Sequence, residues 1–449
     1  MATQYSIQGT TAKGLAASVE RGVTEGELAP GDALPPVRRL ADELGISPGT
    51  VATAYKELRR RGLVVTRGRG GTVVAEAPSV ASRRPPRVPP GLVDLASGLP
   101  DPAFLPVLRP PAEVRPVYGS HRAAPRLSAL EELTRAWFAR DGVPAERVTF
   151  AHGALDCIAR LLSVELRPGD AVAVEDPGFH HLLDLVPALG LRMVPVAVDG
   201  EGITPEALGV ALRAGVRAVV CSPRAQCPTG ASFSTGRRDE LASMLREFPE
   251  VLVVEDDYNV EIAGPLAPTL AASGLERWAQ VRTVSKRLGV DLRWAGVAGD
   301  PVTVARHDGR MLMTSGWVSH VLQETVVGLF SDPAVAGLVA AGEAAYAERR
   351  GVLVEALEAR GVGVAGGAGE AGGPGGAGGL NVWVPVRDES AVVNGLRTRG
   401  WWVAAGARFR IASPTAVRIT TATLEGAEGR RLAGDFADVL GEAEATYGG

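Results

Sequence analysis

The spacing of hydrophobic residues changes along the chain, and its first 62 residues follow a helical period. In residues 47–62, "SPGTVATAYKELRRRG", apolar positions recur at i, i+3, i+4 and i+7, after Ser47 as N-cap and Pro48 in the first turn. The stretches "LAASVERGV" and "VRRLADEL" predict two earlier helices, the second ended by Gly45. "LVVTRGRGGTVV" then predicts a β-hairpin. This order predicts a winged helix-turn-helix over residues 1–75.

Beyond this head the pattern becomes that of an α/β protein. Residues 76–92 are rich in Pro, Arg and Ser, which predicts a linker. From residue 93 to about 320, short apolar runs such as "AVAVED", "VLVVEDD" and "VRTVS" alternate with helical patterns. This rhythm predicts a mostly parallel, doubly wound sheet with helices on both faces and a ligand site at the strands' C-terminal ends. Residues from about 330 to 449 predict a smaller α+β lobe that completes a domain spanning 93–449.

Composition adds a charge asymmetry to this picture. The net charge is −4, but residues 1–75 hold ten Lys and Arg against seven Asp and Glu, which leaves −7 on the rest. A basic head on an acidic body predicts a polyanionic partner for the head alone. The three cysteines lack CxxC spacing, so we expect neither a disulfide framework nor a metal site. An apolar signal core and a long uncharged apolar run are both absent, so we expect a cytoplasmic protein.

The head has the residue types that DNA binding requires. A recognition helix presents its N-terminal side chains to base edges while basic residues meet phosphates. The candidate DNA contacts are Arg38, Arg39, Ser47, Gly49, Thr50, Arg67 and Arg69. The run "RRR" at 59–61, taken alone, reads better as a solvated helix end favoured by the helix dipole.

Residues 34–74, "LPPVRRLADELGISPGTVATAYKELRRRGLVVTRGRGGTVV", resemble the GntR family of winged-helix regulators. The resemblance implies that Arg38, Thr50 and the glycines and arginines of the wing approach DNA. Pro48 departs from the family, because many relatives have an arginine there that contacts guanine in the major groove. The operator sequence therefore does not carry over from relatives.

A second set of residues lies at the ends of the predicted strands. Lys286, one of only three lysines, closes the run "VRTVSK", and a lysine that forms a Schiff base must be partly desolvated. Asp256 and Tyr258 end another run, where a carboxylate could hold a protonated pyridine nitrogen and a phenol could donate to a ring oxygen. Phe179 in "DPGF" could stack on a flat ring. The small residues of "AHGALDC" begin a helix whose free N–H groups suit a phosphate.

Each of these features alone has a more ordinary explanation, such as a turn, a cap or core packing. Their joint order resembles fold-type I pyridoxal-phosphate (PLP) proteins of the aspartate aminotransferase class, over residues 92–440. The resemblance implies that Lys286 forms the internal aldimine, Asp256 pairs with the pyridine nitrogen, Tyr258 contacts the ring hydroxyl and Phe179 stacks on the ring. It also implies the following contacts: phosphate binding by Ala154, Leu155, Thr283, Ser285, Arg293 and a dimer partner's Tyr118, and binding of a substrate or effector carboxylate by Arg418.

The segment "SPRAQCPTG" departs from the aminotransferase pattern. Aminotransferases usually have an asparagine before Pro-Thr-Gly that donates a hydrogen bond to the ring oxygen, whereas this chain has Cys227, a poor donor. Unless Gln226 compensates, efficient transamination is in doubt, although PLP binding is not. The Gly/Ala-rich loop at 361–379 has no evident chemistry.

A winged helix joined to an aminotransferase-like domain is the architecture of MocR/GabR-type regulators. It implies a domain-swapped homodimer that binds paired DNA half-sites and senses PLP or an aldimine of PLP with an amine. Two alternatives remain open: an active aminotransferase that carries a DNA-binding head, and a DNA-binding protein whose second domain is only a dimerisation scaffold.

Overall fold

The computed structural model describes residues 5–24, 27–29, 31–60, 63–66, 71–74, 88–109, 111, 125–264, 268–365 and 378–447. The chain divides into two compact units, one made mainly of residues 1–84 and the other mainly of residues 85–449. Arg67, Arg69 and Tyr118 lie outside the described residues, as do most of the predicted linker and most of the 361–379 loop.

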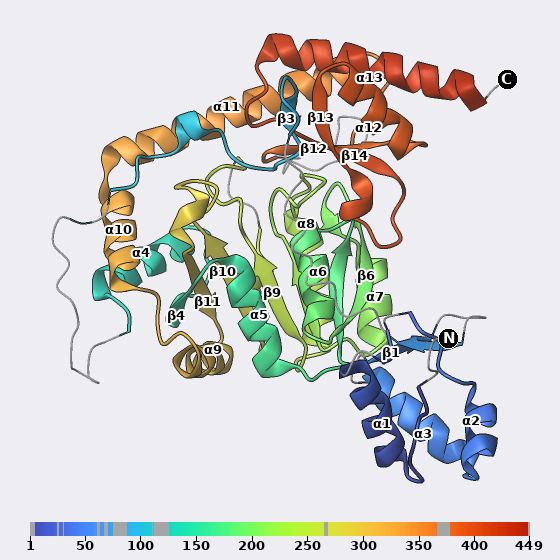
Figure 1. Cartoon of the computed structure of the whole chain (residues 1–449). Coiled ribbons are helices and arrows are strands. Elements are labelled where there is room, and N and C mark those ends of the chain that lie inside the picture. Colours follow the sequence, from blue (N-terminus) through green and yellow to red (C-terminus); the bar gives the residue numbers. More distant parts are fainter. Residues whose placement is uncertain are drawn as a thin grey trace. The chain divides into compact units, whose positions relative to one another are not determined.

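The first unit has the predicted three helices and a hairpin (Figure 1). Their bounds are α1 Ala12–Thr24, α2 Val37–Leu44, α3 Pro48–Arg60, β1 Val64–Thr66 and β2 Thr72–Val74, and the two strands pair antiparallel. Gly45 ends α2 in the left-handed region at φ 64°, where glycine carries no Cβ penalty. The Ser47 hydroxyl accepts a hydrogen bond from Thr50 N at 3.1 Å, so the predicted cap of α3 is confirmed.

The second unit is built on an eight-stranded sheet in the order β4-β11-β10-β9-β8-β5-β6-β7. Its central strands β5, β8, β9 and β10 are parallel, and the apolar runs that predicted them are buried along their whole length. The strand bounds are β4 Val148–Ala151, β5 Ala171–Asp176, β6 Arg192–Asp199, β7 Gly202–Ile203, β8 Ala218–Cys221, β9 Leu252–Asp256, β10 Trp278–Thr283 and β11 Ala295–Gly299.

The strand β11, from the run "WAGVAG", departs from a simple parallel arrangement because it lies antiparallel to both β10 and β4. A parallel neighbour needs a crossover connection that is usually a helix, whereas residues 284–294 contain only the 3-10 turn Val290–Leu292. The chain therefore turns back beside β10, and this turn contains Lys286 and Arg293.

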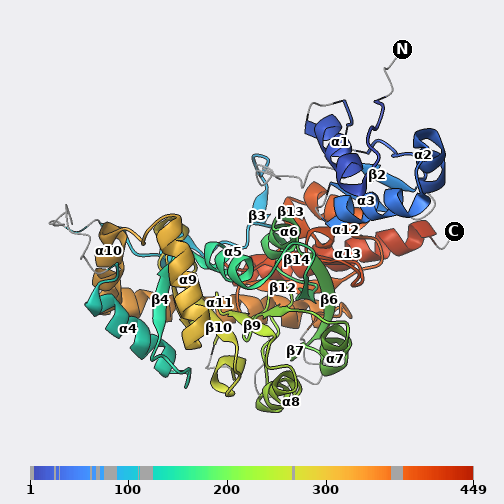
Figure 2. The same cartoon turned by 90° about the horizontal axis from the view of Figure 1, so that it is seen from below.

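Helices cover both faces of the sheet, as predicted (Figure 2). On one face, Leu208, Leu212, Leu241 and Leu245 of α7 and α8 share a core with alternate strand residues such as Val219. The helix α5 packs on the other face against β9, β10 and β11, with α9 beside it. The helix bounds are α4 Ser128–Ala139, α5 Ala154–Glu165, α6 His180–Ala188, α7 Pro205–Arg213, α8 Thr235–Arg246 and α9 Pro301–Met313.

The C-terminal lobe is α+β, and its four-stranded sheet has the order β12-β14-β13-β3. The strand β3, Val93–Leu95, joins this sheet from the beginning of the unit and lies parallel to β13. The remaining bounds are β12 Asn381–Pro385, β13 Trp401–Ala405, β14 Ala416–Thr420, α10 His320–Ser331, α11 Pro333–Glu358, α12 Glu389–Thr398 and α13 Gly426–Tyr447. Within the described residues no single helix is long and apolar enough to cross a membrane, although α10 and α11, bent by 74°, pass that test as a pair.

Candidate functional site

A pocket of about 290 Å³ lies at the C-terminal ends of the central strands, beside the small lobe. Most of the predicted cofactor residues line it, although they are far apart in sequence. They are Ala154, Leu155, Phe179, Cys227, Asp256, Tyr258, Thr283, Ser285, Lys286, Arg293 and Arg418. Gln226 does not line the pocket, and Tyr118 is outside the described residues.

Lys286 lies three residues after the end of β10, and its amine is held inside the pocket. Its Nζ donates a hydrogen bond to Gly98 O. Burial, opposed by Cys227 and assisted by the charge of Arg418, lowers the pKa of Lys286 to about 8. A substantial fraction of the amine is therefore neutral near physiological pH, and a neutral amine can attack a carbonyl group.

Asp256 ends β9 and is 5% exposed. Burial, followed by the neighbouring charge of Asp257, raises the pKa of Asp256 to about 7. Its Oδ1 has no hydrogen-bond partner among the described residues. A buried carboxylate oxygen without a donor is costly, so this oxygen is suited to a cationic or N–H group supplied by a ligand.

The other aspartate of the pair has a structural role. Asp257 accepts hydrogen bonds from Arg282 Nε and Arg224 Nη2, both at 3.0 Å, and Arg224 also bonds Asp141 at 2.6 Å. These two arginines and two aspartates are almost fully buried and neutralise one another. The cluster holds the end of β9 in place, so the direction of Asp256 is fixed by its neighbour.

The start of α5 forms an anion cradle. Gly153 precedes the helix at φ 92°, and a Cβ there would lie 2.6 Å from Arg293 Nη2, so glycine leaves room for this guanidinium at the helix N-terminus. Among the described residues no carboxylate pairs with Arg293. The hydroxyls of Thr283 and Ser285 lie 2.9 Å apart on the same side of the pocket. Free N–H groups, a guanidinium and two hydroxyls together suit a phosphate group.

Aromatic rings form one wall of the pocket. The Phe179 and Tyr258 rings are near-parallel, at 13° with centroids 6.3 Å apart. The Tyr258 hydroxyl donates to Ala225 O at 2.8 Å, and burial raises the pKa of Tyr258 well above its usual value. Tyr258 therefore remains a neutral phenol, and its single O–H is engaged by Ala225 O.

The Pro-Thr-Gly loop presents sulfur to the pocket rather than an amide. Gln226 is fully engaged elsewhere: its Nε2 donates to Glu175 at 3.1 Å and Pro177 O at 2.8 Å, and its Oε1 accepts from Thr229. Cys227 Sγ lies 3.9 Å from Arg418 Nη1, and burial raises the pKa of this thiol. Gln226 therefore has no free donor to offer in the pocket, and it does not compensate for the weak donor Cys227.

Arg418, from β14 of the small lobe, reaches the same pocket and is 3% exposed. Its Nη2 donates to Ala96 O, and its guanidinium lies 4.5 Å from the centroid of the Phe409 ring. A Cβ at Gly98 would lie 3.1 Å from Arg418 Nη1, so the segment around Gly98 packs closely against this guanidinium. A buried arginine with a planar fork is suited to a carboxylate.

Several lining residues were not predicted from the sequence. His180 and His181 begin α6 directly after Phe179. Their position soon after a predicted strand could have identified them as pocket residues. Burial, with the charges of His181 and nearby arginines, lowers the pKa of His180 to about 2, so this ring is neutral. Gly98 and Asn381 come from segments with no local signal, because only the fold brings them to the pocket.

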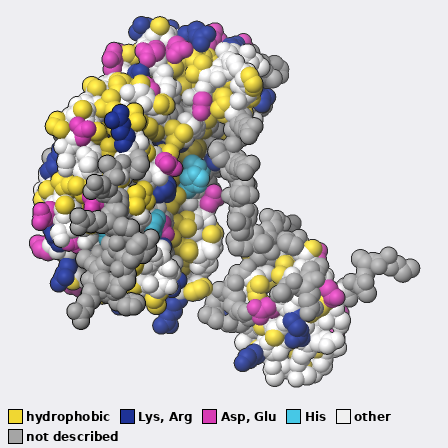
Figure 3. Space-filling view, turned by 60° about the vertical axis from the view of Figure 1, so that its left-hand side comes forward, with side chains coloured by type: hydrophobic (Ala, Val, Ile, Leu, Met, Phe, Trp, Pro, Cys, Tyr) yellow, Lys and Arg dark blue, Asp and Glu magenta, His cyan; other side chains and the backbone are white. Residues whose placement is uncertain are grey.

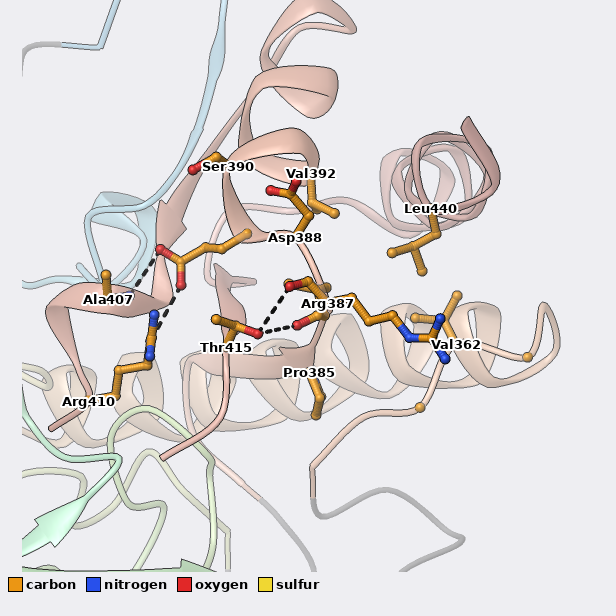
Figure 4. Close-up of a pocket in the computed structure, with 14 residues that line it drawn as sticks. Val362, Pro385, Arg387, Asp388, Ser390, Val392, Ala407, Arg410, Thr415 and Leu440 are labelled. Carbon is orange, nitrogen blue, oxygen red and sulfur yellow. Dashed lines mark hydrogen bonds and ion pairs between the residues drawn. The ribbon is translucent and has the colours of Figure 1, made fainter. Parts of the chain in front are cut away.

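A second cavity, of about 870 Å³, lies elsewhere in the small lobe (Figure 4). The Glu389 carboxylate at the start of α12 accepts from Ala407 N at 3.1 Å and lies 3.6 Å from Arg410 Nε. Val362, Val392 and Leu440 form apolar walls. None of the predicted cofactor residues borders this cavity.

Five of the predicted DNA contacts lie in the described part of the winged-helix unit. Arg38, Arg39, Ser47 and Gly49 are exposed and Thr50 is half-buried, and Arg39 pairs with Glu43 at 2.8 Å. Arg59 is exposed, in keeping with a solvated helix end, and it also donates to Thr66 Oγ1 at 3.0 Å, which links α3 to the hairpin. On the face of the second unit seen in Figure 3, acidic and basic side chains are interspersed, with no basic stripe among the side chains it colours.

Two family models match the chain in the order of its two units. Residues 11–74 match the bacterial regulatory proteins of the gntR family, and residues 124–436 match aminotransferase class I and II. The chain is 38% identical over 448 residues to the vitamin B6 salvage pathway transcriptional repressor PtsJ of Salmonella typhimurium, covering 97% of this chain and 99% of that protein.

More distant matches include a second transcriptional regulator and solved structures of aminotransferases. The pyridoxine biosynthesis transcriptional regulator PdxR of Corynebacterium glutamicum is 30% identical, over 60% of this chain and 62% of PdxR. The structure of Pyrococcus horikoshii kynurenine aminotransferase superposes with a TM-score of 0.67 at 21% identity, covering 79% of this chain and 91% of that one. LysN, the α-aminoadipate aminotransferase of Thermus thermophilus, gives 0.66 at 20% identity, covering 80% and 94%. At this identity the two enzymes establish the fold alone.

Proposed function

Because this chain belongs to the MocR-type family of DNA-binding transcriptional regulators, in which a GntR-type winged helix is joined to an aminotransferase-like domain, we propose that it is a PLP-responsive regulator. The observation that carries the proposal is the meeting, in one pocket, of an amine with a lowered pKa and a buried carboxylate oxygen that lacks a donor.

The pocket residues fit PLP at its ring nitrogen and at its phosphate. The unpartnered Asp256 Oδ1 suits the protonated pyridine nitrogen, and the cradle of Gly153, Arg293 and the α5 N-terminus suits the phosphate. Thr283 and Ser285 add hydroxyl donors, Ala154 and Leu155 add backbone amides, and Phe179 offers an aromatic face. When bound, PLP supplies an aldehyde that captures amines and a ring that withdraws electrons.

Each side chain then has a defined task. Lys286, with its pKa of about 8, would supply the neutral amine that holds the cofactor. Asp256 would pair with the protonated ring nitrogen, and Tyr258 would donate to the ring oxygen only by giving up its hydrogen bond to Ala225 O. Arg418 binds the carboxylate of an amino-acid effector if one enters.

The names of two relatives support a proposal for the effector and the target genes. PtsJ and PdxR carry names that refer to vitamin B6 salvage and pyridoxine biosynthesis. We therefore propose that PLP itself is the signal and that the controlled genes serve the supply of vitamin B6. A ligand shifts DNA binding only if it binds two arrangements of the protein with different affinity, so PLP must favour one of them.

DNA is bound by the head, with Arg38, Arg39, Ser47, Gly49 and Thr50 as the proposed contacts. The wing arginines Arg67 and Arg69 belong to the same proposal. We further propose a cytoplasmic homodimer, domain-swapped so that each subunit's Tyr118 completes its partner's phosphate site and two heads read paired half-sites.

Transamination is the second candidate, because Lys286, Asp256 and Arg418 are the residues it would need. Cys227 and the engaged Gln226 argue against it, since neither donates strongly to the ring oxygen. Turnover of an amino donor with a keto acid, lost in Lys286→Ala, would establish the enzyme.

The decisive experiment combines a spectrum with DNA binding. Purified protein plus PLP should give a visible absorption band that is lost in Lys286→Ala and kept in Lys13→Ala, whose lysine is exposed in the other unit. Affinity for DNA upstream of the protein's own gene should change with PLP in the wild type and in Lys13→Ala only. A band with no change in DNA affinity would refute the sensing role, and no band would refute PLP binding.

A further inference from the structure

Asp176, the last residue of β5, is bound by a segment of the small lobe. Its Oδ1 accepts from Ile411 N at 2.8 Å and from the Ser413 hydroxyl at 2.7 Å. Its Oδ2 accepts from Ala412 N at 2.7 Å and Ser413 N at 2.9 Å. The side chain is 5% exposed, so a buried carboxylate of the large domain is held by three consecutive backbone N–H groups of the small lobe.

The segment that binds Asp176 is itself firmly attached to the small lobe. Before it, Ala407 N and Arg410 both contact the Glu389 carboxylate at the start of α12 (Figure 4). After it, the Thr415 hydroxyl donates to Val386 O at 2.5 Å. The segment therefore moves with the small lobe, and its contact with Asp176 crosses the boundary between the lobes.

The same contact joins two walls of the ligand pocket. Gly178 N donates to Phe409 O at 2.7 Å, which ties the loop before Phe179 to the segment a second time. The Phe409 ring lies 5.0 Å from the His180 ring and also stacks beneath the Arg418 guanidinium at 4.5 Å. Phe409 therefore contacts both His180, beside the aromatic wall of the large domain, and Arg418 of the small lobe.

We propose that Asp176 is a positioning residue that makes these two walls act as one, so that ligand binding in the pocket is transmitted to the small lobe. The inference rests on the proposed function because it takes PLP as the ligand. A charged carboxylate is required, since four donors converge on its two oxygens and an amide would present N–H groups to two of them.

The test compares Asp176→Asn with a matched buried aspartate. Asp300 accepts three backbone N–H bonds at 3.0 Å, from Val302, Thr303 and Trp278, but all of them lie within the large domain. Asp300→Asn therefore removes similar bonds without crossing between lobes. Affinity for PLP, DNA affinity with and without PLP, and hydrogen exchange at Ile411, Ala412 and Ser413 are measured for both variants and the wild type.

In Asp176→Asn we expect PLP affinity to fall by about tenfold or more and the effect of PLP on DNA affinity to disappear. Exchange at 411–413 should be fast with or without PLP, whereas in the wild type PLP slows it. Asp300→Asn should keep both PLP responses even if it melts at a lower temperature. Should Asp176→Asn fold poorly, Ser413→Ala removes one of the four bonds and should show a smaller loss in the same direction.

Equal PLP responses in Asp176→Asn, Asp300→Asn and the wild type would overturn this inference and leave the proposed function intact. A wild-type protein without a PLP band would overturn the proposed function, and the inference with it.

Discussion

At the scale of single residues, the pocket holds two ionisable groups whose burial disfavours their charged forms. The pKa of Lys286 is lowered to about 8 and that of Asp256 is raised to about 7, in both cases chiefly by burial. Both residues were expected from the sequence, because each follows a buried apolar run at a strand end. The size and direction of these shifts depend on the surrounding burial, which the sequence does not show.

Lys286→Met should stabilise the ligand-free protein at pH 7. The pKa of Lys286 is about 8 in the folded chain against an ordinary value of 10.5, so its burial costs stability fully below pH 8 and progressively less as pH rises to 10.5. The expected gain is about 3 kcal/mol at pH 7, falling toward zero above pH 10.5. Denaturant unfolding over this pH range measures it, with Lys13→Met as the exposed control. A variant less stable than wild type at pH 7 would contradict the expectation.

Asp256→Asn should weaken PLP binding by about 10- to 150-fold, the range expected for a charge-assisted hydrogen bond of about 1.5–3 kcal/mol. Equilibrium dialysis gives the affinities. The control ligand is a PLP analogue with carbon in place of the ring nitrogen. Wild type should prefer PLP over this analogue, and the variant should lose the preference. An unchanged preference would mean that Asp256 does not contact the ring nitrogen.

At the scale of elements, the start of α5 shows how local geometry makes an anion site. The sequence predicted small residues at a helix N-terminus, and the structure adds the approach of Arg293 to Gly153 across the pocket. Arg293 itself has φ 44°, a left-handed backbone conformation that residues other than glycine rarely adopt. The strained turn after Lys286 is thus what aims this guanidinium at the helix.

Gly153→Ala should separate phosphate binding from ring binding. The added Cβ would lie 2.6 Å from Arg293 Nη2, so the guanidinium must move away from the cradle. We expect PLP affinity to fall about tenfold or more while affinity for pyridoxal, which lacks the phosphate, changes little.

The matched control is Gly215→Ala, which has a similar φ of 78° but no atom within 4 Å of the added Cβ. It should cost about 1 kcal/mol of stability through backbone strain and leave the ratio of PLP to pyridoxal affinity unchanged. Equal losses for PLP and pyridoxal in Gly153→Ala would argue against a phosphate cradle.

At the scale of the whole molecule, charge is divided between a basic head and an acidic body. Phosphate contacts release counterions, so DNA affinity should fall steeply as salt increases. Arg38 and Arg39 are both exposed, but Arg39 pairs with Glu43. Arg38 is therefore the arginine more available to DNA.

Arg38→Ala should weaken DNA binding and reduce the slope of log affinity against log salt by about one. Fluorescence anisotropy at several salt concentrations measures this slope. Arg21→Ala, at the exposed end of α1 and outside the helix-turn-helix, should leave it unchanged. If both variants give the same slope, Arg38 does not contact a phosphate.

The sequence by itself determined the order of elements and the chemistry at the ends of successive strands, because both depend on local spacing. Helical periods, caps and buried apolar runs placed α1 to α3, the hairpin and strands β5, β8, β9 and β10. The antiparallel course of β11 and the entry of β3 into the small lobe were not visible, since strand partners are chosen by the packing of distant segments.

Only the tertiary structure decided which distant groups meet. It brought Gly98 to Lys286, His180 and Asn381 into the pocket, and the segment 411–413 to Asp176, while it turned Gln226 away. The physical reason is that a local pattern records which face of an element is buried. The partners across a pocket depend on how loops and lobes close around it, and that information is spread over the whole chain.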